Sequence, residues 1–231
     1  MMHNVKTYAA CRTVDTTLYD ASQFDAVLDR VVARKRIKAT MLSMASESHP
    51  SFASKAAWFA IQTPDNRELV VKKLLDDEKI VTAFPMVPGP RTYKRGRVSE
   101  GEKTPLLAGY LLIKIVPSPA AFVGLRQVKG VVDIVGGCEK PWRVSQEDVS
   151  RFIALTDLEL RAAADLEFSR GDRVLFGFGP FKGIEGVIEK LHATRLHRND
   201  SPAMLHADIT ACVHGQWHNL KRTPLALLEK L

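Results

Sequence analysis

The stretch RGDRVLFGFGPFKGIEGVIEKL, residues 170–191, decides how the C-terminal part of this chain folds. Its glycines suggest a phosphate-binding loop, but a P-loop needs Lys and Ser or Thr after its last glycine, and here Gly183 and Gly186 precede Ile and Val. A dinucleotide-binding loop opens a long helix, whereas VIEKL is short and rich in β-branched residues. The pattern instead predicts two strands joined by a turn at Gly179-Pro180, with Phe181 in the core and close packing at Gly186.

The rest of residues 169–231 extends this pattern. Short apolar runs are separated by glycines and by a polar loop at residues 192–203, and they read DRVLFGF, GIEGVIEKL, MLHADITACV and GQWHNLKR. Such short strands with glycine turns predict a small β-barrel.

Residues 58–156 alternate between strand and helix patterns. WFAIQT, VTAFPMVP, GYLLIKIV and VVDIVGG are strand-like, and PGPRTYKRGRVSEGEKTP is a polar excursion. RELVVKKLLDDEKI predicts a helix whose apolar face holds Leu69, Val70, Leu74 and Leu75, and VSQEDVSRFIAL predicts a second helix capped by Ser145. The order predicts an α+β fold, a four-stranded antiparallel sheet layered with helices and followed by the small barrel.

The first 57 residues differ in character. Apolar residues recur at helical spacing across residues 22–45, and residues 46–55 form a Ser-rich linker. Translation from Met41 or Met44 would leave the folded pattern intact. We expect an extension at 1–57, partly helical or disordered, an α/β domain at 58–156, a linker at 157–168 and a barrel domain at 169–231.

Composition suits a soluble globular protein: 45% of residues are hydrophobic, and no run approaches the length of a membrane span. Three widely spaced cysteines favour a reducing, cytoplasmic setting. The net charge of +7 divides into +3 for residues 1–57, +4 for 58–156 and zero for 157–231. Contact with nucleic acid is therefore expected of the middle segment more than of the barrel.

The sequence gives little support for an enzyme. His214 and His218 have metal-ligand spacing only on a helix, and the residues between them are strand-like. Neither a nucleophile–base pair nor paired carboxylates stand out, so we expect no catalytic residue, no metal and no cofactor.

The opening stretch resembles the KOW motif of bacterial NusG and several ribosomal proteins. The matching residues are Gly171, Asp172, Val174, Gly179, Pro180, Phe181, Gly183, Gly186 and Val187. Upstream, WFAIQTPDNRELVVKKLL, PLLAGYLLIKI and LRQVKGVVDIVGG with KPWRVSQEDVSRF resemble the N-terminal (NGN) domain of the NusG family, in the family's order. The likeness covers residues 58–231 and implies a transcription elongation or antitermination factor.

The sequence also departs from the family pattern. An aromatic pair and proline of the family become Leu106-Leu107-Ala108, and the basic stretch before them is similar to that of RfaH, a specialised family member. The KOW half is NusG-like. Both a housekeeping and a specialised, RfaH-like factor therefore remain open, as do its target genes and whether the KOW domain changes fold.

In the family, an apolar patch of the NGN domain docks on the β′ clamp helices of RNA polymerase, and a loop faces the β subunit. The resemblance implies polymerase contacts at Trp58, Phe59, Leu106, Leu107, Tyr110 and Phe122. Core packing is the competing interpretation for Trp58 and Tyr110. Contacts to non-template DNA or to polymerase are expected at Arg67, Lys72, Lys73, Arg91, Lys94, Arg95, Arg97 and Lys129.

The KOW domain of the family recruits ribosomal protein S10 or termination factor Rho, and Phe178 and Phe181 are the candidate contacts here. Two alternatives stay open. A KOW-type RNA-binding protein of ribosomal type would need a basic barrel, which the zero net charge of 157–231 does not favour. A phage- or plasmid-borne polymerase modulator is the other.

Overall fold

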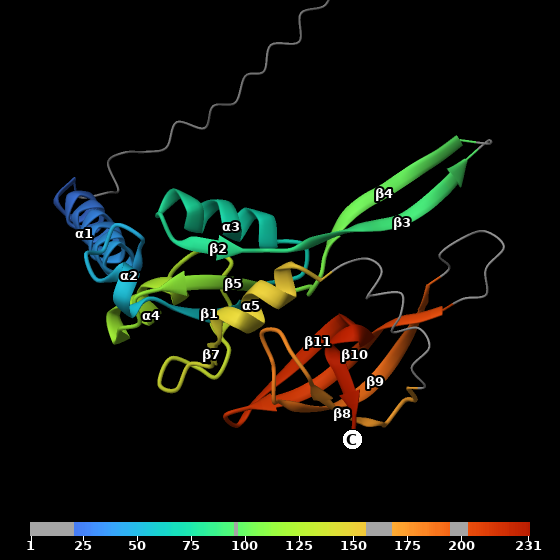
Figure 1. Cartoon of the computed structure of the whole chain (residues 1–231). Coiled ribbons are helices and arrows are strands. Elements are labelled where there is room, and N and C mark those ends of the chain that lie inside the picture. The colour runs from blue at the N-terminus through green and yellow to red at the C-terminus, as the bar shows by residue number, and fades with distance from the viewer. Residues whose placement is uncertain (1–20, 95–96, 156–167, 195–202) are drawn as a thin grey trace, which may run out of the picture. The chain divides into compact units, whose positions relative to one another are not determined.

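The structure is a computed structural model that describes residues 21–94, 97–155, 168–194 and 203–231 (Figure 1). It divides into two compact units, Met1–Ile37 and Lys38–Leu231. Helix α1 (Ala21–Ala45) ends in the second unit, where Leu42 and Ala45 are fully buried. The short helix α2 (Phe52–Lys55) follows where the sequence predicted a linker.

The second unit contains an N-terminal sheet that carries the strands predicted from WFAIQT and GYLLIKIV. β1 lies between β5 on one side and β6 and β7 on the other, and β2 flanks β5. All pairs are antiparallel, which confirms the predicted mixed α/β class. The strands are β1 (Ala57–Gln62), β2 (Val81–Ala83), β5 (Tyr110–Ile115), β6 (Asp133–Ile134) and β7 (Arg143–Val144).

The predicted count of four strands differs from the five observed in this sheet. The extra strand is β7, whose two residues were not predicted as a strand. β6 pairs with β1 at Ile61 and β7 pairs with it at Trp58, so two short strands share one edge of β1.

The polar excursion is a two-stranded hairpin and not a loop. β3 (Met86–Lys94) pairs with β4 (Arg97–Pro105) in a sheet of its own. The predicted strand VTAFPMVP is therefore divided, because β2 ends at Ala83 in one sheet and β3 begins at Met86 in another.

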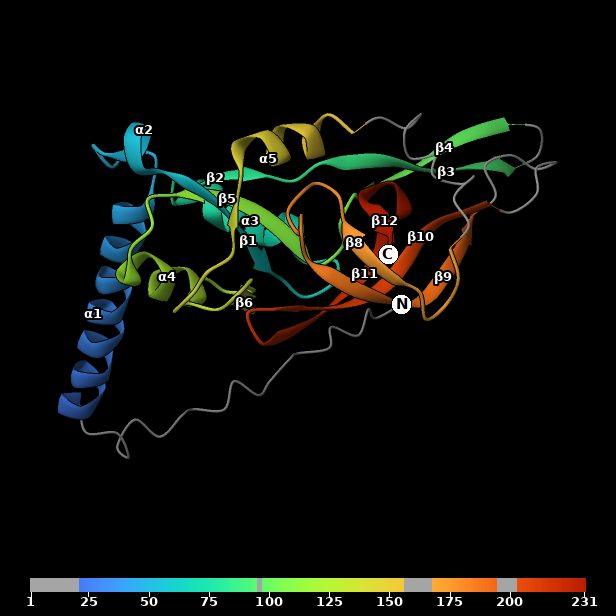
Figure 2. The same cartoon turned by 60° about the horizontal axis from the view of Figure 1, so that its bottom comes forward.

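Three helices cover the two faces of the N-terminal sheet. One face packs against α3 (Glu68–Asp77) and α4 (Pro119–Arg126), and the other packs against α5 (Gln146–Ile153) (Figure 2). Ser145 caps α5 as predicted, because its hydroxyl accepts the Asp148 amide at 3.0 Å.

The predicted apolar face of α3 is partly wrong. Val71 and Leu75 are buried with Glu68, whereas Leu69 and Val70 are 60% and 54% exposed. The sequence pattern left several helix rotations open, and packing against the sheet selected the one that also buries a carboxylate.

The opening stretch of the sequence forms strands of a second antiparallel sheet, which we call the C-terminal sheet. Its strand order is β11-β10-β9-β8-β12. Phe181 is 1% exposed, and a Cβ on Gly186 would lie 2.6 Å from Ile209 Cγ2, so both predicted core roles are confirmed. The elements are β8 (Arg173–Phe176), β9 (Glu185–Thr194), β10 (Ala203–Val213), β11 (Gln216–Pro224), the 3-10 helix η3 (Leu225–Leu227) and β12 (Leu228–Lys230).

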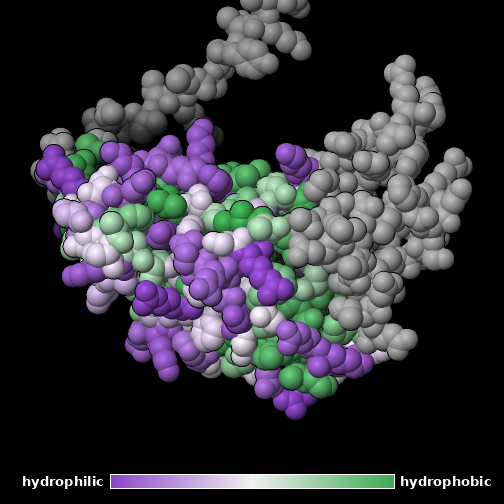
Figure 3. All heavy atoms as spheres, in the orientation of Figure 1, coloured by the Kyte–Doolittle hydropathy of each residue, from purple (hydrophilic) through white to green (hydrophobic). Residues whose placement is uncertain are grey.

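Buried side chains form two clusters. One lies between the N-terminal sheet and helices α3 and α4. The other joins the opposite face of that sheet, α5 and the C-terminal sheet into a single hydrophobic core. On the face shown in Figure 3, hydrophobic residues lie in several small areas among hydrophilic ones.

Candidate functional site

The turn before β5 presents the residues expected to contact a partner. Buried Glu68 of α3 accepts the Gly109 amide at 2.7 Å, and the Gly109 carbonyl accepts the Thr63 amide at 2.8 Å. Gly109 has φ of +79°, a conformation that L side chains rarely adopt. These contacts hold Leu107 and Tyr110 on the face of the N-terminal sheet that carries α5, and we call this surface the docking face.

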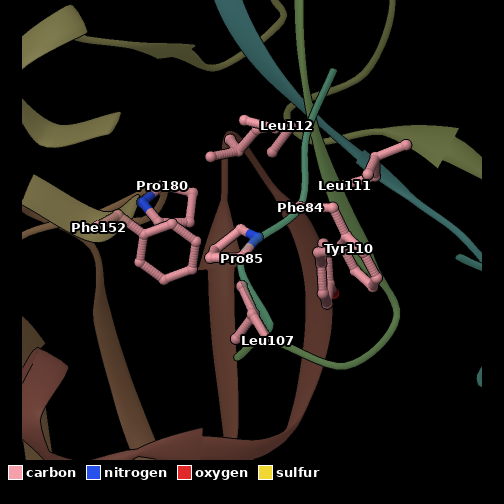
Figure 4. Close-up of a pocket in the computed structure, with 10 residues that line it drawn as sticks. Phe84, Pro85, Leu107, Tyr110, Leu111, Leu112, Phe152 and Pro180 are labelled. Carbon is pink, nitrogen blue, oxygen red and sulfur yellow. The ribbon is translucent and has the colours of Figure 1, made fainter. Parts of the chain in front are cut away.

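The docking face surrounds a small apolar cavity of about 10 Å³, roughly the space of one water (Figure 4). Residues of β1, β2, β5, α5, the segment after β2 and the turn before β5 line it, and Pro180, from the turn between β8 and β9, lies beside Phe152. The lining residues are Ala60, Ala83, Phe84, Pro85, Leu107, Tyr110, Leu111, Leu112, Phe152 and Pro180.

The C-terminal sheet covers the docking face through aromatic side chains. The rings of Tyr110 and Phe181 meet edge to face, with centroids 5.2 Å apart. The Tyr110 hydroxyl lies 3.4 Å from Nδ1 of His218 on β11. Burial raises the pKa of Tyr110, and the nearby Asp65 carboxylate adds to the rise, so this phenol stays neutral.

Polar contacts form a rim around this apolar centre. The Trp142 indole N–H donates to the Pro180 carbonyl at 3.1 Å, and His214 Nδ1 lies 2.7 Å from the Lys140 carbonyl. The Arg151 guanidinium lies 4.1 Å from the centre of the Phe178 ring. Two ion pairs complete the rim: Lys182–Asp148 at 3.1 Å and Lys221–Asp65 at 2.6 Å.

Several buried polar atoms are unpaired in the described residues. They are Thr63 Oγ1, Gln216 Oε1 and His218 Nε2. Thr63 precedes the rim residue Asp65, while Gln216 and His218 lie on β11 with inward-facing side chains. Burying a polar atom without a hydrogen-bond partner costs about 1–3 kcal/mol. These three atoms therefore reduce the stability of the structure.

The structure divides the expected polymerase contacts between the two clusters. Trp58, Leu106, Leu107 and Tyr110 share the cluster of the docking face, and all four are under 9% exposed. Phe59 and Phe122 lie in the other cluster, where their rings meet edge to face at 5.2 Å. Geometry thus brings four of the six predicted residues together.

Sequence reasoning missed other residues of this face. Phe84 and Pro85 lie between two strands that the sequence read as one, and Phe152 follows Val149 at helical spacing on α5. The helical period of α5 could have identified Phe152 as buried, but no sequence signal paired it with Pro180.

The structure describes all but one of the residues expected to contact nucleic acid. Arg67, Lys73 and Lys129 are exposed, and Lys72 forms an ion pair with Asp76 on α3. Arg91 and Lys94 lie on β3 and Arg97 lies on β4, opposite Lys94. Arg95 lies outside the described residues.

The residues that resemble a KOW motif have structural roles here. Asp172 accepts the Ser169 amide at 2.8 Å and pairs with Lys230, whose hydrogen bond lowers the pKa of this carboxyl group, with a further contribution from that amide. Gly171, Gly179 and Gly183 have positive φ angles and allow turns. Phe178 and Phe181, the expected partner contacts, are buried in this state.

In the described ranges, His, Cys, Asp and Glu side chains form no group of three or more that could hold a metal ion. None of the helices found there is long and apolar enough to cross a membrane.

Comparisons with known proteins find similarity over part of this chain. Residues 56–153 match the family model described as "Transcription termination factor nusG". The chain is 27% identical over 145 residues to the transcription termination/antitermination proteins NusG of Chlamydia trachomatis and Chlamydia muridarum, covering 58% of this chain and 78% of each relative.

Among solved structures, the chain resembles NusG of Thermotoga maritima, with 21% identity and a TM-score of 0.36. That likeness covers 78% of this chain and 99% of the other. An MjSpt4:Spt5 complex in its conformation A matches at 14% identity and a TM-score of 0.25, covering 75% and 97%.

The family match spans the N-terminal sheet with α3, α4 and α5, which is the part that carries the docking face, and both curated relatives bear the same family name. The match over residues 56–153 and the two curated relatives together support a factor of the NusG family of transcription termination and antitermination proteins.

Proposed function

We propose that this protein binds RNA polymerase through the docking face and recruits a second protein through the C-terminal sheet. The observation that carries the proposal is the apolar face itself: Leu107 and Tyr110 are held by a turn beside Phe152, and their cover is another part of the same chain. Once uncovered, an apolar face of this kind would suit a helical partner such as the β′ clamp helices.

Docking requires the C-terminal sheet to move away. Leu107 and Tyr110 are 4% and 5% exposed, so a partner helix has no access to them while Phe181 and Pro180 lie in place. The cover is held mainly by the shared hydrophobic core. The ion pairs and the few hydrogen bonds at its rim each contribute little.

The second partner would use the same C-terminal residues after opening. Phe178 and Phe181 are buried here, and they would become free when the sheet separates. Ribosomal protein S10 and Rho are the candidates that the family suggests. The zero net charge of residues 157–231 favours a protein over RNA at this surface.

Exposed Arg67, Lys73 and Lys129 support a salt-sensitive contact with non-template DNA beside the polymerase. The polymerase β subunit is a further contact, expected near Phe122. Such a factor would work in the cytoplasm of a bacterial cell, beside its polymerase.

Co-purification with core RNA polymerase tests the docking face. Leu107→Asp places a charge on this face and should abolish binding, because the carboxylate would have to be desolvated. Val123→Asp changes a 44% exposed residue of α4 on the other side of the N-terminal sheet, and should bind like the wild type.

Circular dichroism would confirm that both variants are folded. Unimpaired polymerase binding by Leu107→Asp would overturn the assignment of this face.

A further inference from the structure

The contact between the docking face and the C-terminal sheet has a titratable group at its centre. His218 is 3% exposed, and its ring centre lies 6.2 Å from that of Tyr110. Nδ1 faces the Tyr110 hydroxyl, but Nε2 is buried without a partner in the described residues. A protonated ring would carry an N–H at both positions. It would therefore be a buried cation whose Nε2–H has no hydrogen-bond acceptor.

We propose that His218 is a proton-sensitive release point: when its ring is protonated, the C-terminal sheet separates from the docking face. This deepens the proposed function, because it names what would uncover the surface expected to bind the polymerase.

The charged surroundings of His218 do not compensate a positive ring fully. Asp133 at β6 attracts the charged form, but it lies within 3.6 Å of the Arg126 guanidinium. Asp65, in the turn after β1, is paired with Lys221 of β11. Tyr110 on β5 is neutral and offers only a long contact of 3.4 Å.

Burial lowers the pKa of His218, and it outweighs the opposing effect of Asp133. The closed contact therefore favours the neutral ring. Its full strength is present above the ordinary histidine pKa, and it weakens as the pH falls below that value toward the lowered one. Each pH unit in this window changes the open-to-closed ratio by up to about tenfold.

Other histidines do not duplicate this effect. His214 Nδ1 faces the Lys140 carbonyl at 2.7 Å, where it must donate, and both the neutral and the protonated ring can make that bond. His206 is partly buried on β10, opposite His192 of β9. It forms no described contact with the docking face, so it serves as a matched control.

The three tryptophans provide a direct measurement in the full chain. The Trp142 indole N–H bonds across the contact to Pro180, and the Trp58 indole N–H bonds to Gln146 within the N-terminal part. Trp217 is 74% exposed. Exchange of the Trp142 indole proton therefore reports separation of the contact, while Trp58 and Trp217 serve as internal references.

The experiment measures indole hydrogen exchange by NMR on the free protein at pH 7.5 and 5.5, corrected for the intrinsic rate at each pH. The protection factor of Trp142 should fall by up to about tenfold at pH 5.5, while that of Trp58 stays unchanged. His218→Gln and His218→Asn, which cannot take up a proton, should abolish this response, and His206→Gln should retain it.

An unchanged Trp142 protection factor in the wild type would overturn the proposal, as would a response that persists in His218→Gln. The measurement contains no polymerase. If the protection factor responds but the protein fails to co-purify with polymerase, the release point stands and the docking function fails.

Discussion

At the scale of residues, glycines of the C-terminal sheet lie where neighbouring strands pack closely or where the backbone turns. Gly186 lies on β9, where a Cβ would approach Ile209 Cγ2 to 2.6 Å and the Thr210 carbonyl to 3.2 Å. The second of these is backbone, which cannot rotate away. Gly186 is therefore required for close packing, whereas Gly183, with φ of +80°, allows a turn.

Gly186→Ala should destabilise the protein by about 1–3 kcal/mol, because the added methyl group overpacks the sheet. Urea unfolding at pH 7.5 measures this. Val187→Ala, which trims a neighbouring 41% exposed side chain, is the control and should cost much less. A Gly186→Ala protein as stable as the wild type would show that the strand can shift to make room.

A second prediction at this scale concerns acid sensitivity. Burial lowers the pKa of His206 to about 4, with help from Arg222 and His192. The folded state therefore favours the neutral ring, and stability present above pH 6.5 is lost as the pH falls toward about 4. The loss proceeds at up to about 1.4 kcal/mol per pH unit.

His206→Gln should flatten this decline in urea-unfolding experiments between pH 7.5 and 4.5, while His49→Gln should not. Equal slopes for the wild type and His206→Gln would contradict the assignment.

At the scale of elements, helix caps and packing set the scaffold of the docking face. Ser145 ends the strand β7 and caps α5, which places Phe152 two turns later against the cavity. The Ser145 cap joins residues only three positions apart, so the sequence predicts it. The orientation of Phe152 depends instead on packing against the sheet.

Ser145→Ala should cost about 1 kcal/mol, since the Asp148 amide loses its acceptor. Denaturant unfolding gives the value. Ser150→Ala makes the same chemical change in the middle of α5 and should be neutral, because alanine is the better helix former there. Similar losses for the two variants would argue against a specific capping role.

At the scale of the whole molecule, the docking face and its cover form one hydrophobic core with a polar rim. Lys182 and Lys221 contribute positive charges on the covering side, and each faces a carboxylate, Asp148 or Asp65. Three of these four side chains are exposed, and Asp148 is the exception. We therefore expect the two ion pairs to change the stability of the closed state only modestly.

The double variant Lys182→Glu/Lys221→Glu should lower the Trp142 indole protection factor, because both ion pairs become like-charge contacts. Arg173→Glu breaks the Arg173–Glu185 pair inside the C-terminal sheet and is the control. A double variant with wild-type protection would show that the rim charges do not affect closure.

Sequence and structure contributed differently to this account. The order of strands and helices, the cap at Ser145, the core position of Phe181 and the family likeness could all be predicted, because each depends on local pattern or on neighbouring residues. The rotation of α3 and the splitting of VTAFPMVP into two sheets were not predicted, since packing between distant segments selects them.

The sequence alone determined that the chain has an α/β part followed by a strand-rich part, because side-chain periodicity and glycine spacing are properties of short segments. Only the tertiary structure decided that Leu107 and Tyr110 are covered by Phe181, Pro180 and His218. Residues more than a hundred positions apart meet there, as the Tyr110–His218 contact shows. That meeting depends on which two apolar surfaces bury each other, and no local sequence pattern encodes it.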